Sequence, residues 1–315
     1  MTFAPQLTSE IAEALTLGRP VVALETTLVS HGFSGGRGLD AALESERRVR
    51  AAGATPATIG VLDGVVRVGL DDSELKRFAD AGTDARKLGA RDLAACVVQG
   101  ALGSTTVGGT LAICRAVGIR FVGTGGIGGV HRGFAATLDI SADLPQLART
   151  AAVVVCSGAK SILDVSATAE LLETLGVPVL GWQTSTLPMF YTGTGGPPVS
   201  ATVAHVAEAA AIAATHWQLV PAGGLLLARA PTDGLDLEAV VTEAVEQVRR
   251  AGVTGQAITP AVLAAVAELS GGRSIEVNQR LIADNADLAA RVAVAYADLG
   301  PTSTMAATGP PPSGP

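Results

Sequence analysis

Apolar runs rich in valine and isoleucine alternate along the chain with alanine- and leucine-rich segments of helical period. Short continuous apolar runs are typical of buried strands, and the segments between them are typical of helices that pack on a sheet. The pattern therefore predicts an α/β fold with a mostly parallel central sheet. The predicted strands are residues 21–29, 94–98, 120–123, 152–156, 177–181 and 224–227.

Turn and capping residues add a hairpin and six helices to this pattern. Residues 58–68 are predicted to form a β-hairpin, because Asp63-Gly64 suits the positive φ angles of a tight primed turn. Helices are predicted at residues 9–17, 39–52, 204–219, 235–251, 260–269 and 274–299. We interpret residues 1–303 as one domain, and the Pro- and Gly-rich residues 304–315 as a disordered tail.

Composition supports this fold class and argues against one class of partner. The chain of 315 residues is 48% hydrophobic but only 3% aromatic, which fits close helix-on-sheet packing better than a sandwich built on large rings. Its formal net charge of -7, with no run of lysine and arginine, gives no basic surface for nucleic acid. A local group of cationic residues could still bind one small phosphate.

Cysteine usage and the N-terminal segment bear on the compartment. Cys96, Cys114 and Cys156 are widely spaced and lie in apolar stretches, as is typical of buried thiols in a reducing compartment. The first residues have neither signal-peptide nor transit-peptide character, and no apolar run reaches membrane-spanning length. We therefore expect a cytoplasmic protein that has no membrane contact.

Glu25 is the first candidate for chemistry. The sequence contains no GxxxxGK[ST], HExxH or CxxC motif, which disfavours the common nucleotide-triphosphate and zinc chemistries. Glu25 lies within the apolar run ALETT, where burial would raise the pKa of its carboxyl and let it deliver a proton near neutral pH. A glutamate that pairs with an arginine or caps a helix remains an equal alternative.

A glycine-rich segment, GTGGIGGVHRG, follows the predicted strand 120–123. Its backbone N–H groups could converge on an anion, with His131 and Arg132 adding charge-assisted contacts to a phosphate. No amphipathic helix follows at once, which argues against a dinucleotide site. A flexible loop without a ligand is the alternative.

The segment DISADL carries three polar side chains at alternate positions. If the segment is extended, Asp139, Ser141 and Asp143 point the same way and could bind Mg²⁺, Mn²⁺ or sugar hydroxyls. Asp143 directly precedes Leu144-Pro145, so a helix N-cap is the favoured interpretation of this residue. Capping does not explain Asp139.

Two lysines are candidates for nucleophilic or phosphate-binding roles. Lys160 follows the predicted strand 152–156, where desolvation would lower the pKa of its amine and leave a neutral nucleophile. A snorkelling side chain, or an ion pair with Asp164 at helical spacing, is the alternative for Lys160. Lys87, between Arg86 and Arg91, could belong to a solvated face.

Taken together, these segments resemble the pseudouridine-5'-phosphate glycosidases, also called the indigoidine synthase A-like family. The similarity extends from about residue 17 to about residue 299. It rests on ALETTLVSHG, GATPATIGVLDGVVRVGL, KLGARDL, GSTTVGGT, TGGIGGVHRG, DISADL, CSGAKSILD, LGWQTSTLPMF and GRSIEVNQRLIADNA. The chain has ALETT where the family has ALEST, and Asp284-Asn285 where the family has paired asparagines.

The resemblance implies roles for particular residues. Glu25 matches the proton donor and Lys160 the nucleophile of the family. Asp139 matches a position that binds Mn²⁺, for which Mg²⁺ or another divalent cation is the alternative. The substrate-binding positions implied are Lys87, Thr106, Val107, His131, Ser141, Ala142, Asp143 and Asn285. An α/β/α layered core and a homotrimer are implied as well.

The reaction implied is the reversible cleavage of pseudouridine 5'-phosphate to uracil and ribose 5-phosphate. In the expected mechanism, Lys160 attacks C1' while Glu25 protonates the ring oxygen, and water later hydrolyses the resulting imine. Two other hypotheses are a hydrolase of ordinary N-ribosyl compounds and a non-catalytic sugar-phosphate-binding protein that shares the fold.

Overall fold

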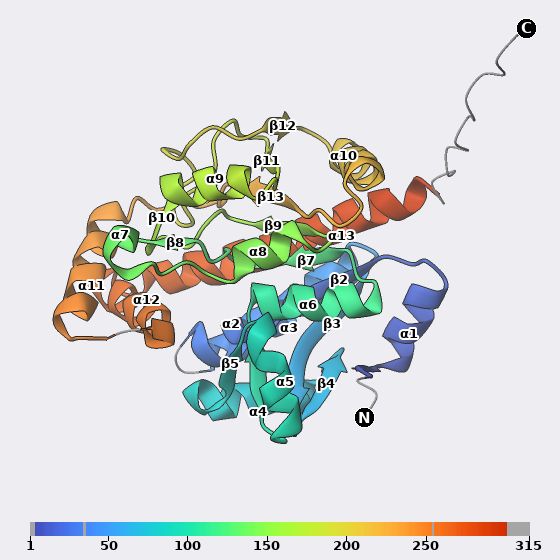
Figure 1. Ribbon diagram of the computed structural model, residues 1–315, viewed down its shortest axis with the longest axis horizontal. Helices are drawn as coiled ribbons and strands as arrows, with labels where there is room; N and C mark the ends of the chain where they lie inside the picture. Colours follow the sequence, from blue (N-terminus) through green and yellow to red (C-terminus); the bar gives the residue numbers. More distant parts are fainter. Residues whose placement is uncertain (1–3, 34–35, 254, 301–315) are drawn as a thin grey trace, which may run out of the picture.

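The computed structural model describes residues 4–33, 36–253 and 255–300, which form a mostly parallel sheet between two layers of helices (Figure 1). The sheet strands are β1 (Gln6–Leu7), β2 (Val21–Glu25), β3 (Thr55–Leu62), β4 (Val65–Val68), β5 (Arg86–Leu88), β6 (Gly103–Thr105), β7 (Phe121–Gly123), β9 (Val153–Cys156), β11 (Val179–Trp182), β12 (Ala201–Val203) and β13 (Leu225–Arg229). The main strand order is β1-β4-β3-β2-β7-β9-β13-β11-β12, and β6 pairs with β3 and β5. A separate antiparallel pair joins β8 (Val130–His131) to β10 (Leu163–Asp164).

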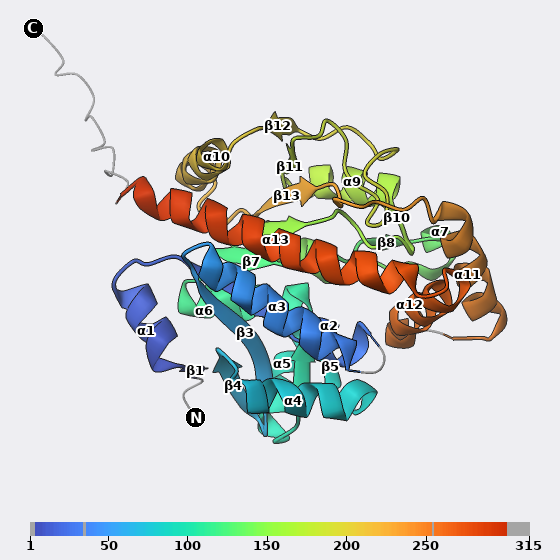
Figure 2. The ribbon, with the colours of Figure 1, turned by 180° about the vertical axis from the view of Figure 1, so that it is seen from behind.

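Helices cover both faces of this sheet. Figure 1 shows α6 (Val107–Val117), α8 (Asp143–Ala148) and α9 (Val165–Thr174) in front of the sheet. Figure 2 shows α3 (Arg37–Ala51), α10 (Val206–Leu219) and the long α13 (Arg273–Asp298) on the opposite face. The other α-helices are α1 (Ser9–Thr16), α2 (Thr27–His31), α4 (Asp72–Ala81), α5 (Leu93–Val98), α7 (Phe134–Thr137), α11 (Glu238–Arg250) and α12 (Ile258–Leu269). The α/β/α layered single domain is confirmed.

The core follows from the two-residue period of the central strands. Val22 and Leu24 belong to the apolar cluster on the α13 side of the sheet, whereas Ala23 belongs to the cluster on the other side. Gly123 lets α13 approach closely, because a Cβ at this position would lie 2.9 Å from the Cα of Ala286. A sheet buried on both faces explains why its strands are continuous apolar runs.

Most predicted elements are confirmed within a few residues. The hairpin forms between β3 and β4, with φ angles of 51° at Asp63 and 80° at Gly64. The six predicted helices correspond to α1, α3, α10, α11, α12 and α13. The predicted tail 304–315, and residues 301–303 of the predicted domain, lie outside the described residues.

Two predicted strands are wrong in part or in full. The run 21–29 leaves the sheet after Glu25, and Thr26 instead donates its hydroxyl to the carbonyl of Ile59 at 2.8 Å. The run 94–98 belongs to the helix α5, in which Cys96 is buried and Val98 is 82% exposed. A short apolar run fits a strand or a helix equally well, so periodicity could not separate the two.

The cysteines and the helices bear on the compartment predictions. Cys96, Cys114 and Cys156 are buried free thiols, as expected. Among residues 4–33, 36–253 and 255–300, no helix is long and apolar enough to span a membrane. The cytoplasmic location and the homotrimer stay predictions.

Candidate active site

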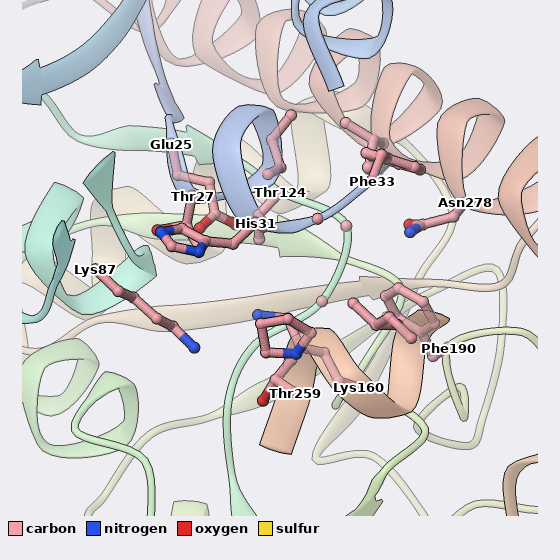
Figure 3. A pocket seen from close by; sticks show the side chains of 17 residues that line it. Glu25, Thr27, His31, Phe33, Lys87, Thr124, Lys160, Phe190, Thr259 and Asn278 are labelled. Carbon is pink, nitrogen blue, oxygen red and sulfur yellow. Dashed lines mark hydrogen bonds between the residues drawn. The ribbon is translucent and has the colours of Figure 1, made fainter. Parts of the chain in front are cut away.

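The carboxyl ends of three neighbouring parallel strands, β2, β7 and β9, meet at one edge of the sheet. Parallel α/β sheets place their ligands at this edge. A central cavity opens there and is lined by Glu25, Thr124 and Lys160 together with residues of α2, α12 and α13 (Figure 3). A second cavity of about 250 Å³, which we call the Asp139 cavity, adjoins it, and both cavities are lined by Lys87, Lys160 and Thr259.

Glu25 is the last residue of β2 and is 3% exposed. The hydroxyl of Thr124 donates a hydrogen bond of 2.5 Å to its Oε1. Burial raises the pKa of the Glu25 carboxyl, while the charges of Lys160 and Lys87 and the Thr124 hydrogen bond oppose this increase. Glu25 therefore neither pairs with an arginine nor caps a helix, which were the two alternatives that the sequence left open. A buried carboxyl of this kind can hold a proton for transfer.

Lys160 lies in the loop between β9 and β10, where its backbone N–H donates to the carbonyl of Ile127 at 3.1 Å. This bond ties the loop after β9 to the glycine-rich loop after β7. Asp164, the alternative partner, instead caps α9 by accepting the N–H of Ala167 at 2.9 Å. The alternative of an ion pair between Lys160 and Asp164 at helical spacing is therefore wrong, since Lys160 is not on a helix.

Lys87 is on β5 and is half-buried, so the alternative that it belongs to a solvated face is wrong. Burial lowers the pKa of the Lys87 amine, and the positive charge of Lys160 lowers it further. Figure 3 shows Glu25, Lys87 and Lys160 arranged around the same space. One carboxyl and two amines thus face a single cavity.

Asp143 joins the start of α6 to the glycine-rich loop after β7. Its Oδ1 accepts the N–H of Gly108 at 2.7 Å, and its Oδ2 accepts the N–H of Gly128 at 2.9 Å. The predicted N-cap role is wrong, because Asp143 is the first residue of α8 and Ala142 occupies the cap position. The carboxylate bridges the start of α6 and the glycine-rich loop, where its negative charge also complements the helix dipole.

The glycine-rich loop does not offer a free ring of N–H groups to a phosphate. The N–H of Ile127 donates to Gly158, that of Gly128 to Asp143 and that of Val130 to Thr168. A Cβ at Gly128 would collide with the side chains of Ser141 and Asp143. The glycines therefore permit close packing. The prediction that the backbone N–H groups of this loop bind an anion is wrong for Ile127, Gly128 and Val130, because each already has a partner within the protein.

The two cationic residues of this loop have different surroundings. Arg132 donates to the carbonyl of Ser161 at 3.2 Å and to the carboxylate of Glu238 at 2.9 Å, and its phosphate contact stays a prediction. His131 lines the Asp139 cavity, and its Nδ1 lies 3.8 Å from the carboxylate of Asp139. Burial lowers the pKa of His131, against the opposing charge of Asp139.

The structure brings most of the predicted substrate-binding residues to the Asp139 cavity. Those that line it are Lys87, Thr106, His131, Ser141, Ala142 and Asp143. Val107 is 1% exposed and does not line any described cavity. Asn285 is fully buried behind the site, where its amide donates to the carbonyl of Thr124 at 2.8 Å and to the hydroxyl of Ser157 at 3.1 Å. Asn285 thus positions the backbone of Thr124.

Asp139 is the one predicted metal ligand, and its carboxylate is 39% exposed at the cavity wall. The described part of the chain contains no group of three or more His, Cys, Asp or Glu side chains that could hold an ion by themselves. Mg²⁺ commonly binds through one or two carboxylates, several waters and substrate phosphates, and Mn²⁺ suits the same oxygen ligands. A single exposed carboxylate beside a polar cavity fits such a water-rich site.

Thr124 and Asn278 line the central cavity but were missed from the sequence. Asn278, on α13, is 6% exposed, and its Oδ1 has no hydrogen-bond partner among the described residues. Both residues lie in motifs that carry the resemblance, TGGIGGVHRG and GRSIEVNQ. Nothing in their spacing marks them, because only the fold brings α13 to the end of β2.

Comparison with known proteins shows which family this site belongs to. The model of the family "Indigoidine synthase A like protein" matches residues 10–295. The chain belongs to this family. A protein of Chloroflexus aurantiacus named pseudouridine-5'-phosphate glycosidase is 47% identical to it, across 94% of this chain and 99% of that protein. A Salinispora tropica protein of the same name is 50% identical, across 91% of this chain and 90% of that protein.

A solved structure extends the comparison to three dimensions. The prealnumycin C-glycosynthase AlnA, in complex with ribulose 5-phosphate, superimposes with a TM-score of 0.85 at 40% identity. The match covers 95% of this chain and 99% of that one. Family and fold therefore agree over the whole sheet and the cleft at its edge.

We expect Asp143→Asn to destabilise the protein by about 1–3 kcal/mol, measured by urea denaturation. An asparagine has one acceptor oxygen, so the N–H of Gly108 or of Gly128 would face an NH₂ group and lose its buried partner. Asp139→Asn, in the same segment but exposed, is the matched control and should change stability by less than about 0.5 kcal/mol. Equal effects of the two substitutions would contradict the bridging role of Asp143.

Proposed function

We propose that this chain catalyses the reversible cleavage of the C–C glycosidic bond of pseudouridine 5'-phosphate, giving uracil and ribose 5-phosphate. The observation that carries the proposal is one cavity that holds a buried carboxyl of raised pKa, Glu25, beside two amines, Lys160 and Lys87. The names of the curated relatives support the same activity. AlnA, a C-glycosynthase that binds ribulose 5-phosphate, supports C-glycoside chemistry on a pentose phosphate.

The bond to be broken explains why a lysine and a carboxyl are needed. The leaving atom is carbon C5 of uracil, which must take up a proton as the C1'–C5 bond breaks. Attack of the Lys160 amine on C1', with Glu25 protonating the ring oxygen, opens the ribose. Transfer of a proton to C5 then releases uracil and leaves an imine between C1' and Lys160. Water hydrolyses this imine to ribose 5-phosphate and restores the amine.

The cavities suggest how the substrate lies across the site. Lys87 and Asn278 are at opposite ends of the central cavity in Figure 3, and Lys87 also lines the Asp139 cavity. The ribose phosphate would occupy the Asp139 cavity, with the ammonium form of Lys87 binding its charge. The base would lie toward Asn278, whose Oδ1 has no hydrogen-bond partner among the described residues and would accept an N–H of uracil.

A divalent cation, Mn²⁺ or Mg²⁺, would be held by Asp139 together with water and substrate oxygens. The ion would offset the negative charge of the phosphate as the substrate binds. Proton transfer and covalent attack are assigned to Glu25 and Lys160, which line the central cavity.

We expect Lys160→Ala and Lys160→Arg to reduce the release of uracil from pseudouridine 5'-phosphate to background, because neither variant has an amine that can attack C1'. Lys76→Ala is the matched control, since Lys76 is an exposed lysine paired with Asp80 on α4. Uridine 5'-phosphate should not be cleaved by any of these proteins. Near-normal turnover by Lys160→Ala, or cleavage of uridine 5'-phosphate by the wild type, would contradict the proposal.

Within the same assay, Glu25→Gln should lower kcat by about 10²–10⁴-fold, the usual contribution of a general acid. Burial raises the pKa of Glu25, so the proton donor is present at low pH and is lost as the pH rises through the raised value. The wild-type kcat should therefore fall on the alkaline side, and the residual activity of Glu25→Gln should lack that fall. If the kcat of Glu25→Gln still fell on the alkaline side, the fall would have to be assigned to another titrating group.

We expect Asp139→Asn to weaken Mn²⁺ binding, in the presence of ribose 5-phosphate, by about tenfold or more. Free Mn²⁺ is measured by electron paramagnetic resonance, so the result does not depend on activity. Asp80→Asn, an exposed aspartate outside the cleft, should bind Mn²⁺ as the wild type does. Unchanged binding by Asp139→Asn would remove Asp139 as the ligand.

A further inference from the structure

His31 lines the central cavity but has no part in the reaction as described above. It is the last residue of α2, and its side chain is half-buried. Glu25, Lys87 and Lys160 line the same cavity. Figure 3 shows the His31 ring on the same side of this cavity as Glu25 and Lys87. A titratable ring therefore borders the space in which the sugar is joined to Lys160.

One hydrogen bond fixes which ring nitrogen of His31 carries a hydrogen. Nε2 lies 3.0 Å from the carbonyl oxygen of Ala85, the residue before β5. A carbonyl oxygen only accepts, so Nε2 must be the donor. In a neutral imidazole, Nδ1 then has a lone pair and no hydrogen. Among the described residues nothing donates a hydrogen bond to Nδ1, which is left for water or substrate.

The surroundings of the ring favour its neutral form. Burial lowers the pKa of His31, the hydrogen bond to Ala85 opposes this change, and the positive charge of Lys87 lowers the pKa further. Glu25 and Lys160 are the other charged groups of the cavity among the described residues. A neutral imidazole with a free Nδ1 can take a proton near neutral pH.

The elements packed against α2 leave this balance unchanged. They are α3, α4, β6 and the 3₁₀ turn at residues 82–84. Asp84, the acidic residue of that turn, is exposed to solvent. Asp80, at the end of α4, is exposed and pairs with Lys76. Burial, the Ala85 bond and Lys87 therefore set the charge of His31.

Water can reach His31 from outside the central cavity. A second cavity of about 160 Å³ lies between the loop after α2 and the helices α12 and α13, and His31 lines both spaces. Thr83 and Ala264, which also line the second cavity, are exposed. Water that enters as uracil leaves therefore reaches the His31 ring.

The last step of the proposed reaction needs a proton carrier besides Glu25. Hydrolysis of the protonated imine removes both protons from one water molecule. Glu25 gave up one proton when the ribose opened, so it can take back only one of the two. The other must end on the nitrogen of Lys160, which leaves as a neutral amine. Direct transfer from the water oxygen to that nitrogen would pass through a strained four-membered ring, so a third group is needed.

We infer that His31 is the base that activates water for hydrolysis of the Lys160 imine. This inference rests on the proposed function and adds a catalytic residue to it. The water oxygen bonds to C1', one water proton passes to Nδ1, and an electron pair of the C=N bond moves to the nitrogen. The imidazolium then gives its proton to this nitrogen. The C1'–N bond breaks as Glu25 takes the hydroxyl proton, which releases ribose 5-phosphate and restores all three side chains.

His31→Gln separates this step from the release of uracil. The glutamine amide can keep the hydrogen bond to Ala85, but it has no basic nitrogen. With pseudouridine 5'-phosphate in rapid-quench experiments, uracil release in the first turnover should stay within about twofold of the wild type. The steady-state kcat should fall by about 10²-fold or more, because hydrolysis has lost its base. The time course should then show a burst of uracil that matches the enzyme concentration.

Borohydride added during steady turnover measures the imine directly. Most of the His31→Gln protein should be recovered as the reduced sugar-phosphate adduct on Lys160, and less of the wild type, by intact-protein mass spectrometry. His205→Gln is the matched control, since His205 is an exposed histidine before α10. It should equal the wild type in the first turnover, in kcat and in the amount of adduct.

The pH dependence of imine hydrolysis provides a second measurement. Exchange of heavy oxygen from labelled water into C1 of ribose 5-phosphate follows this half-reaction without uracil, with Lys160→Ala as the background. Neutral His31 is present above its lowered pKa and is lost as the pH falls through it, so the exchange should slow on the acidic side. His31→Gln should lack this fall. Imidazole added to His31→Ala should restore part of the lost kcat.

Two results would overturn the inference. One is an equal loss of first-turnover uracil release and of kcat in His31→Gln, with no effect of imidazole on His31→Ala, which would assign His31 to the structure of the cavity. The other is a kcat within about twofold of the wild type in both variants. A wild type that releases no uracil from pseudouridine 5'-phosphate would instead overturn the proposed function.

Discussion

The burial of one carboxyl group at the end of a central strand is the constraint on which the cleft depends. Glu25 is almost fully removed from water, and an isolated charge there would be very unfavourable. The hydroxyl of Thr124 and the positive charges of Lys160 and Lys87 offset part of that cost. The same burial raises the pKa of Glu25 and lowers that of Lys87, because removal from water disfavours the charged form of each group.

The scaffold keeps these groups in place through loops that bind one another. Asp143 joins the start of α6 to the glycine-rich loop, and the backbone of Lys160 joins that loop to the end of β9. Asn285 holds Thr124 from the opposite layer, on α13. Glycines at the close contacts, such as Gly128, make this packing possible. Neither Asp143 nor Asn285 has to touch substrate to influence the reaction. Asp143 fixes the glycine-rich loop that accepts the backbone N–H of Lys160, and Asn285 fixes the backbone of Thr124, whose hydroxyl binds Glu25.

The sequence predicted the layered fold well because buried parallel strands are continuous apolar runs with helical segments between them. It failed where the same local pattern fits two structures, as in α5, and where a polar residue has two possible partners. Asp143 looked like a helix cap, yet its acceptors meet N–H groups from two other elements. Asn278 could not be identified locally, because its place in the cleft depends on how α13 crosses the end of β2. Glu25 and Lys160 were found, since Glu25 interrupts an apolar run, Lys160 follows one, and their motifs resemble one family.

The central claim is that Lys160 forms the covalent bond to the sugar. The most direct measurement is intact-protein mass spectrometry after incubation with ribose 5-phosphate, Mn²⁺ and borohydride, followed by peptide mapping of any adduct. The account predicts one reduced sugar-phosphate adduct on the wild type, located at Lys160 and absent from Lys160→Ala. An adduct on Lys87 that persists in Lys160→Ala, or no adduct on the wild type, would contradict it.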